Sequence, residues 1–519
     1  MRKSVIIISI IFIIIVGSLF FLQYKFKSTI INAIENEVPQ NIQIKYSQIH
    51  VNAVLGNIKI DSFSVKLLNS EKHIVSKLNA KNLSVIGFNL ASFIINNKVS
   101  IKNIRLKNPQ LQYFNDKTAK IKQDNSNQKK TSHNSLKEIK VDEISVINGF
   151  LKIHQNKQDS IYAKIDNINF SLNEFCTSTI KLKEKIPFTY KDFKLKSQHL
   201  FLNMSNYEDL KIDDLAFENN KLILKNLYIA PKFSKEVLST KIAVERDHIQ
   251  LHIPQSEFNK LDIGCSQKKF FVILDSGKIT KPNLMIYRDK RVADDLEIKN
   301  LYSKMLRDLS FELDVAKLKI EQGYVSYSEQ LEDADKAGKV FFDAINASIT
   351  NLSNINKNNE KTEFSANSNF MGKAPMVLDI SFDVTNKQDA FLGSGEFKNF
   401  NAKIASDFFE SNLNAKATGE FEQIYFTFSG NNLNSEGDLK MKYENFEFKI
   451  LNNKNEVNKF LTAIGNLFIK DNSKADKNGF RYGKIKVERN KNKSFFNYLW
   501  INVEDGIKST LTGNGKKKM

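Results

Sequence analysis

Residues 376–384 read MVLDISFDV, and apolar side chains alternate in them with polar ones. In an extended chain Leu378, Ile380, Phe382 and Val384 point to one side, and the residues between them point to the other. This two-residue period predicts a β-strand with one apolar and one water-facing side. The period recurs along most of the chain, which is therefore predicted to be mainly β.

A second strand of this kind places Leu439, Met441 and Tyr443 on one side. We predict that such strands build an elongated, curved antiparallel β-groove with a few short helices at its ends. The candidate lipid-groove lining residues are Leu378, Ile380, Phe382, Val384, Leu439, Met441 and Tyr443. The alternative is that these residues form a compact core without room for a ligand, because buried apolar stripes are usually core.

A degenerate motif recurs along the chain, with three spaced apolar residues, a turn residue and two alternating apolar residues. The first copy consists of Ile101, Ile104, Leu106, Pro109, Leu111 and Tyr113. Further copies begin at Val141, Ile212, Leu274 and Val315. Because glycine, proline or asparagine occupies the turn position, each copy is interpreted as strand, turn and strand. The uneven spacing of the copies predicts a stack of related hairpins rather than a strict repeat.

The N-terminal sequence predicts a membrane anchor. Residues 4–22, SVIIISIIFIIIVGSLFFL, contain no charged residue, and a membrane-spanning helix needs roughly 20 apolar residues. A cleaved signal peptide is the alternative, but the run exceeds the roughly 7–15 apolar residues of such a peptide and no A-x-A-like site follows it. Neither Cys176 nor Cys265 is near the N-terminus, which excludes a lipid anchor on a cysteine.

The charges that flank the predicted span do not decide its orientation in the membrane. Arg2 and Lys3 on one side are matched by Lys25 and Lys27 on the other. A very short N-terminal tail usually stays in the cytoplasm, whereas a long domain translocates largely regardless of its charge. We therefore expect the body of the chain to lie outside the cytoplasm.

The predicted organisation follows from the changes in periodicity and polarity. It consists of a cytoplasmic tail at 1–3, the transmembrane helix at 4–22, a helical stalk at 23–40, an N-terminal β region at 41–115, a flexible polar linker at 116–138, the β-groove body at 139–493 and a C-terminal aromatic and basic segment at 494–519. Helical spacing also predicts short helices at 296–309, 402–413 and 457–468. We interpret them as caps over an open end of the sheet.

The composition limits the classes of partner. The two cysteines allow at most one intramolecular disulfide, so apolar burial must hold the fold. A net charge of +19 is compatible with nucleic acid or anionic lipid as a partner. Because the lysines alternate with apolar residues and no basic patch with interleaved aromatics stands out, we expect a solvated lysine face and no nucleic-acid partner.

Motifs of catalysis and of cofactor binding are absent from the sequence. His248 and His252 have a spacing that binds metals on a helix, but apolar residues alternate with them, which predicts a strand with both histidines outward. Residues 332–338, EDADKAG, start like a calcium loop, but Ala337 and Ala344 occupy places that need acidic ligands. There is no phosphate-binding glycine loop and no nucleophile elbow. We therefore expect a non-enzymatic chain with no metal and no cofactor.

The C-terminal segment combines aromatic residues with a basic end. Such a combination suits a membrane interface or an anionic partner. The candidate membrane-contact residues are Phe495, Phe496, Trp500, Lys516, Lys517 and Lys518. The alternative is a final helix that caps the last strands with Trp500 in the core.

Several stretches together resemble AsmA-like proteins of the Gram-negative envelope, of the Bacteroidetes type. They are residues 51–67 (VNAVLGNIKIDSFSVKL), 83–114 (LSVIGFNLASFIINNKVSIKNIRLKNPQLQYF), 284–291 (LMIYRDKR), 318–329 (LKIEQGYVSYSE) and 494–500 (SFFNYLW), in this order behind an N-terminal anchor. The resemblance implies a protein of the inner membrane whose periplasmic body carries phospholipid or another envelope lipid toward the outer membrane. It implies as the alternative a non-catalytic scaffold or regulator of outer-membrane protein assembly, with envelope proteins as partners.

Overall fold

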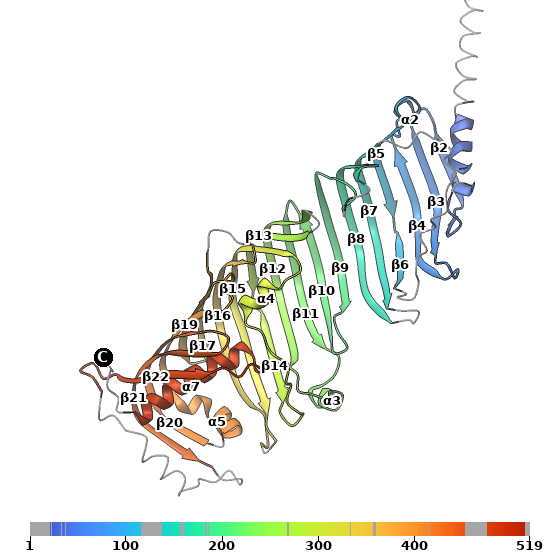
Figure 1. Cartoon of the computed structure of the whole chain (residues 1–519). Coiled ribbons are helices and arrows are strands. Elements are labelled where there is room, and N and C mark those ends of the chain that lie inside the picture. Colours follow the sequence, from blue (N-terminus) through green and yellow to red (C-terminus); the bar gives the residue numbers. More distant parts are fainter. Residues whose placement is uncertain are drawn as a thin grey trace, which may run out of the picture. The chain divides into compact units, whose positions relative to one another are not determined.

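The computed structural model describes residues 21, 23–32, 34–36, 38–115, 138–155, 160–181, 184, 186–266, 269–332, 334–355, 360–413, 415–451 and 475–513. Strands make up 62% and helices 14% of the structure, which confirms the prediction of a mainly β chain. Contacts divide the chain into an N-terminal unit, Met1–Asn203 with Leu210–Asn219, and a C-terminal unit, Met204–Asp209 with Asn220–Met519. Each unit is built mainly of β-strands (Figure 1).

The N-terminal unit begins with helical residues and continues as strands. Residues 23–32 and 34–36 are helical, as predicted for the stalk. The Gln23 side chain accepts a hydrogen bond from Ala53 N (2.7 Å) and donates one to Val51 O, so this helix is held against the first strands. The elements that follow are β1 (Ile42–Lys45), β2 (Gln48–Asn52), β3 (Asn57–Leu68), β4 (Ile74–Ile86), α2 (Leu90–Asn96), β5 (Lys98–Lys107), β6 (Gln110–Asn115), β7 (Glu138–Gln155), β8 (Ile161–Ser178), β9 (Asp192–Asn203) and most of β10 (Glu208–Glu218).

The C-terminal unit contains the remaining strands and most of the short helices. Its strands are β11 (Lys221–Pro231), β12 (His248–Ser266), β13 (Lys269–Thr280), β14 (Asn283–Asp289), β15 (Glu312–Gln330), β16 (Gly338–Ser353), β17 (Thr362–Phe370), β18 (Ala374–Phe382), β19 (Phe391–Asn401), β20 (Ala415–Gly430), β21 (Asn434–Ile450) and β22 (Arg481–Glu488). Its helices are α3 (Lys235–Ser239), α4 (Tyr302–Arg307), η2 (Ala402–Ala405), α5 (Ser406–Leu413) and α7 (Phe495–Thr512).

The strand pairing is mixed, so the prediction of an antiparallel sheet was only partly right. Most neighbours are antiparallel, but β5 and β6 pair with β7 in parallel, and β13 and β14 pair with β15 in parallel. Parallel neighbours require a crossover connection, because the chain must return to the start of the next strand. Between β14 and β15 this crossover contains α4. The residues between β6 and β7, which include the predicted linker, lie outside the described residues.

In four of its five copies the recurring motif marks these parallel strands and not hairpins. Ile101 of the first copy lies opposite Val141 of the second, and Leu111 lies opposite Leu151. At Asn108 (φ +48°) the chain kinks and then continues in the same direction, because β5 and β6 both pair with β4 on one side and with β7 on the other. In the second copy Gly149 sits at a β-bulge within the single strand β7. Four of the five predicted hairpins were therefore wrong, because a kink or a bulge does not reverse the chain. The copy that begins at Ile212 does form strand, turn and strand, because Asn219 (φ +52°) and Asn220 (φ +57°) make a two-residue turn between β10 and β11.

The predicted helices are found in part. The segment 296–309 is helical only in α4, and 402–413 corresponds to η2 and α5. The predicted helix at 457–468 lies outside the described residues. The predicted transmembrane helix at 4–22 also lies outside them, apart from Phe21, and among the residues that the structure does describe no helix is both long and apolar enough to cross a membrane.

Candidate functional site: an apolar sheet face

Apolar side chains of the N-terminal unit form continuous rows across its strands. Residues directly opposite each other on paired strands point to the same face, so the registers of β3, β4, β5, β7, β8 and β9 define the rows. The first row is Ile58, Val85, Ile104, Ile144, Leu172 and Phe193. The second row is Ile60, Leu83, Leu106, Val146, Phe170 and Leu195. We call these twelve residues the apolar rows.

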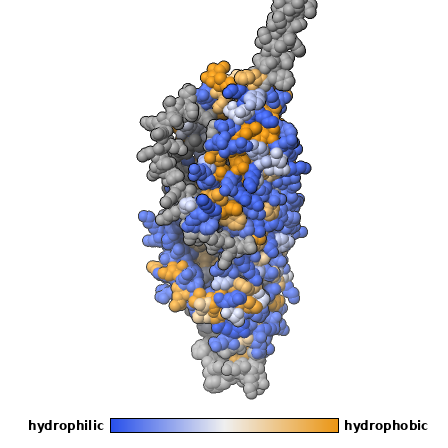
Figure 2. Space-filling view, turned by 90° about the vertical axis from the view of Figure 1, so that its right-hand side faces the viewer, coloured by the Kyte–Doolittle hydropathy of each residue, from blue (hydrophilic) through white to orange (hydrophobic). Residues whose placement is uncertain are grey.

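The apolar rows are half-buried rather than enclosed. Only Ile60 and Leu172 are less than about a tenth exposed, and the other ten keep a larger part of their surface accessible. Figure 1 shows the reason, because strands β3 to β9 form a single layer with α2 at the end of the strands. Neighbouring rows cover the flanks of each side chain but not its end. Figure 2 shows one side of the molecule, where hydrophobic residues gather in patches with hydrophilic residues beside them.

The opposite face of the same strands is polar. The residues opposite each other there are Lys59, Ser84, Arg105, Ser145, Ser171 and Lys194. Lys194 Nζ on this face forms an ion pair with Glu218 Oε1 at 2.7 Å, and at the start of β5 and β7 Lys98 Nζ pairs with Glu138 Oε2 at 2.9 Å. The hydrogen bond from Lys98 lowers the pKa of the Glu138 carboxyl. The sheet is thus amphipathic, with many of its lysines on the side away from the apolar rows.

The C-terminal unit carries a similar row. Leu222, Phe258, Gly277, Leu318, Ile349, Phe364 and Ile380 lie opposite one another from β11 to β18. A side chain at Gly277 would meet Leu318 Cδ1 at 2.6 Å and Phe258 Cδ1 at 3.0 Å. This position therefore stays without a side chain so that its two larger neighbours can close over it.

Helices cover the apolar face at the end of this unit. Helix α7 packs on β21 and β22, and its Phe495, Tyr498 and Leu499 join a core that includes Phe426, Phe428 and other residues of β18 to β22. The crossover between β14 and β15 joins the same core through Leu301. We call β17 to β22 with α4, α5 and α7 the covered end.

Polar contacts fix these helices over the sheet. Asn502 of α7, which is fully buried, accepts a hydrogen bond from Ser435 Oγ (2.6 Å) and donates one to Tyr498 O (2.7 Å). Asp389, in the loop between β18 and β19, accepts hydrogen bonds from Ser303 Oγ and from Arg307 Nη2, both at 2.8 Å. These groups are satisfied within the protein, so the covered end is a closed, specifically packed core.

The predicted lining residues lie at this covered end. The core brings together Ile380, Leu439, Met441 and Tyr443, with Leu378 and Phe382 packed against it. Val384 is also buried, in the loop after β18. They share the apolar face, but Leu439 and Met441 are at most 1% exposed. This burial favours the compact-core alternative for these residues, and their contact with a ligand stays a prediction.

The predicted membrane-contact residues differ in their exposure. Phe495 is buried in the core, whereas Phe496 is 66% and Trp500 39% exposed. The Trp500 ring lies at 5.7 Å from that of Phe408 in α5. The final helix therefore caps the last strands without taking Trp500 into the core. Lys516, Lys517 and Lys518 lie outside the described residues.

The sequence alone did not identify the apolar rows as a candidate site. Ile104, Leu106, Ile144 and Val146 belong to the recurring motif, so the signal was present in their alternation. Their assembly into rows depends on the parallel pairing of β5 with β7, which periodicity does not reveal.

Groups suited to metal binding are not gathered in the part of the chain that the structure describes. It holds no group of three or more His, Cys, Asp or Glu side chains placed to bind a metal ion. His248 is buried, with Nε2 at 3.0 Å from Phe233 O, so the prediction that both histidines point outward was wrong for it. The His252 ring stacks on Tyr228 at 4.3 Å. Cys176 and Cys265 are free thiols.

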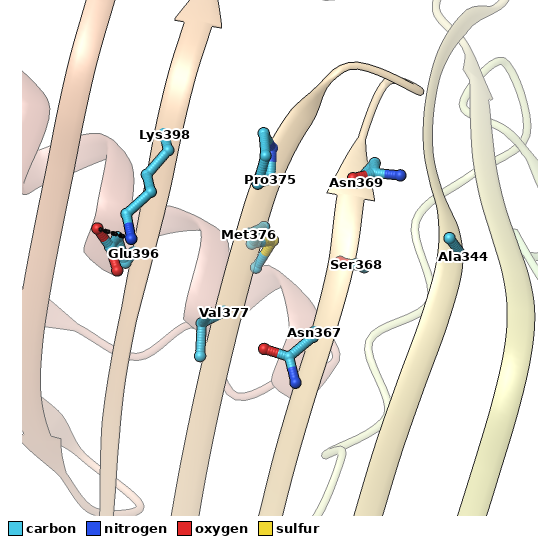
Figure 3. Close-up of a pocket in the computed structure, with 9 residues that line it drawn as sticks. All are labelled: Ala344, Asn367, Ser368, Asn369, Pro375, Met376, Val377, Glu396 and Lys398. Atoms are coloured by element: carbon cyan, nitrogen blue, oxygen red, sulfur yellow. Dashed lines mark ion pairs between the residues drawn. The ribbon is translucent and has the colours of Figure 1, made fainter.

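A small pocket of about 260 Å³ lies between β16 and β19 (Figure 3). Its walls combine amides such as Asn367 with the side chains of Met376 and Val377. The charged groups in it are Glu396 and Lys398, which form an ion pair at 3.1 Å. Because these two charges are paired with each other, we assign the pocket no role. The chain matches no protein-family model, and no curated protein matches it.

Proposed function

We propose that this chain is anchored in the inner membrane of a Gram-negative envelope and that its periplasmic body binds or guides lipid along the apolar rows. The observation that carries the proposal is the continuity of these rows. Each row passes over six strands without a polar side chain, and its members remain partly accessible. An acyl chain needs such an unbroken apolar surface, because each methylene group that leaves water gains roughly 0.8 kcal/mol.

The amphipathic sheet suits this function for a second reason. Lipid tails on the apolar rows would leave the charged headgroup at the margin of the sheet, where water and lysine side chains are accessible. Such an arrangement needs no reactive group and no cofactor. The AsmA-like resemblance of the sequence supports the same function, and transport toward the outer membrane is part of the proposal.

Photocrosslinking from neighbouring residues tests the proposal in the intact chain. Phe170 lies in the second apolar row, whereas Asn169, next to it on β8, is exposed on the polar face. Each is replaced in turn by p-benzoylphenylalanine in cells whose phospholipids carry labelled phosphate. We expect a lipid adduct at position 170 and none at position 169.

Other results of this experiment would contradict lipid binding. Equal labelling at both positions would show contact without selection for the apolar face. A protein adduct at position 170, in place of a lipid adduct, would favour the alternative function as a scaffold for outer-membrane protein assembly.

A further inference from the structure

One end of the N-terminal unit exposes a cluster of large apolar side chains. Val54 and Leu55 in the turn between β2 and β3 are 68% and 62% exposed, and Ile94 and Ile95 in α2 are 68% and 76% exposed. Ile86 ends β4 beside them. We call these five residues the tip. Figure 1 shows α2 at this end of the strands.

Three segments meet at the tip through Phe88. Its backbone N–H donates to Gly56 O at 2.9 Å, which joins α2 to the turn between β2 and β3. Its ring lies at 5.7 Å from Phe26 in the N-terminal helical residues and at 5.8 Å from Phe93 in α2. Asn89 caps α2 through its side chain, which accepts from Ser92 N at 2.9 Å. The exposed residues are thus presented by a well-fixed structure, because hydrogen bonds and ring contacts hold all three segments.

The segment that precedes the tip is the uncharged run of residues 4–22. Gln23, directly after this run, is hydrogen-bonded to Val51 and Ala53 on the strand side of the turn. The first described residues after this run therefore lie beside the tip. Phe21 and Tyr24, at this junction, are 62% and 72% exposed.

The charges on β4, α2, β5 and β6 are of one sign, whereas Asp61 of β3 is paired with Lys59 Nζ at 2.9 Å. Residues 72–115, which include β4, α2, β5 and β6, contain lysines and an arginine but no aspartate or glutamate. Lys25 and Lys27 on the helical residues are exposed as well. A rigid apolar projection with cations around it matches the interface of an anionic bilayer, where apolar side chains enter below the headgroups and lysines remain among them.

We propose that the tip inserts into the surface of the membrane that holds the anchor, and so places the first strands of the sheet against the lipid headgroups. The inference rests on the proposed anchor, but it does not require that lipid moves along the apolar rows. Five aliphatic side chains at one place are otherwise costly, because soluble surfaces rarely keep such a contiguous apolar patch in water.

Strand β4 offers a matched pair of positions for the test. Ile86 at the tip and Ile74 at the opposite end of the strand are both isoleucines, and both are 38% exposed. Cys176 and Cys265 are first replaced by serine in the full chain. A single cysteine is then introduced as Ile86→Cys, Ile95→Cys or Ile74→Cys and is labelled with an environment-sensitive dye. Each labelled chain is placed in nanodiscs of phosphatidylethanolamine and phosphatidylglycerol.

We expect the dye at positions 86 and 95 to emit at shorter wavelength than at position 74, and to be quenched by spin-labelled lipid. Equal emission and equal quenching at all three positions would overturn the inference. A shift at positions 86 and 95 that spin-labelled lipid does not quench, and that disappears on dilution of the protein, would show contact with a second copy instead. A chain that does not enter nanodiscs would refute the anchor and the tip contact together, whereas the crosslinking at position 170 tests the lipid-binding function separately.

Discussion

The apolar rows of the N-terminal unit and the covered end of the C-terminal unit share the same strand pattern, but helices cover it only in the second region. In both, alternating apolar residues of paired strands lie in register on one face. At the covered end, helices bury this face until Met441 and Leu439 lose nearly all exposure, whereas the members of the apolar rows are mostly half-buried. The comparison teaches that alternation makes an apolar face, and that a covering helix decides whether this face is a core or a surface.

The largest difference is expected when an aspartate is placed in each region. Met441→Asp puts an unpaired charge into a site with no exposure, which costs several kcal/mol and should unfold the covered end. Leu106→Asp should cost only about 1–2 kcal/mol, because water reaches this half-buried position. Urea unfolding followed by circular dichroism measures both changes.

The control for this comparison is Lys107→Asp, which changes the charge beside Leu106 on the exposed polar face. It should leave stability nearly unchanged. If Leu106→Asp destabilised the chain as much as Met441→Asp, the apolar rows would be a closed core and the proposed lipid surface would be wrong.

A smaller effect is expected where α7 meets the sheet. A Cβ atom at Gly506 would lie 2.8 Å from Leu439 Cβ and 3.0 Å from Ile485 Cγ1. Gly506→Val should therefore push α7 away from the sheet at a cost of about 1–3 kcal/mol, as overpacked cores do. The variant should also bind an apolar fluorescent dye more strongly than the parent chain, because residues of the covered end become accessible.

Lys508→Ala is the matched control on the exposed side of the same helix. Its effect should stay within about 0.5 kcal/mol, without added dye binding. Unchanged stability and dye binding in Gly506→Val would mean that α7 is not held tightly on the sheet, and would remove the distinction between the two regions.

The sequence predicts which strand face is apolar, but it does not predict whether a helix covers that face. Alternation placed Ile380, Leu439 and Met441 on the apolar face correctly, since side-chain direction in a strand depends only on sequence spacing. Whether a helix covers that face depends on contacts between distant residues, such as Gly506 with Leu439. The sequence therefore could not separate a groove from a core at this place.

Strand direction was missed for a related reason. Pro109 and Gly149 are typical turn residues and were interpreted as ends of hairpins, although they lie at kinks or bulges within strands that keep their direction. The information lay in the similarity of the copies, because Ile101 and Val141, which open two of them, lie opposite each other in parallel strands. The exposed tip was missed because its residues come from a turn, a strand end and a seven-residue helix, and such short pieces carry no periodic signal.

The smallest effect is expected at Asp289, at the end of β14. This buried carboxylate accepts hydrogen bonds from Arg291 Nε (2.8 Å), Arg291 Nη2 (2.7 Å) and Ser239 Oγ (2.7 Å), and so ties α3 to the strand. The hydrogen bonds from Arg291, helped by that from Ser239 and opposed by burial, lower the pKa of Asp289 to about 2.

Because the pKa of Asp289 is lower in the folded chain than the ordinary value of 3.8, the ionised carboxylate stabilises the fold above about pH 4, and this contribution is lost as the pH falls from about 4 toward 2. It amounts to at most about 2 kcal/mol. Asp289→Asn should be less stable than the parent chain at pH 7 and should approach it at pH 2, in urea unfolding measured at both values. A constant difference between the two chains across this range would show that the carboxylate acts by its shape and not by its charge, and would leave the attachment of α3 independent of pH.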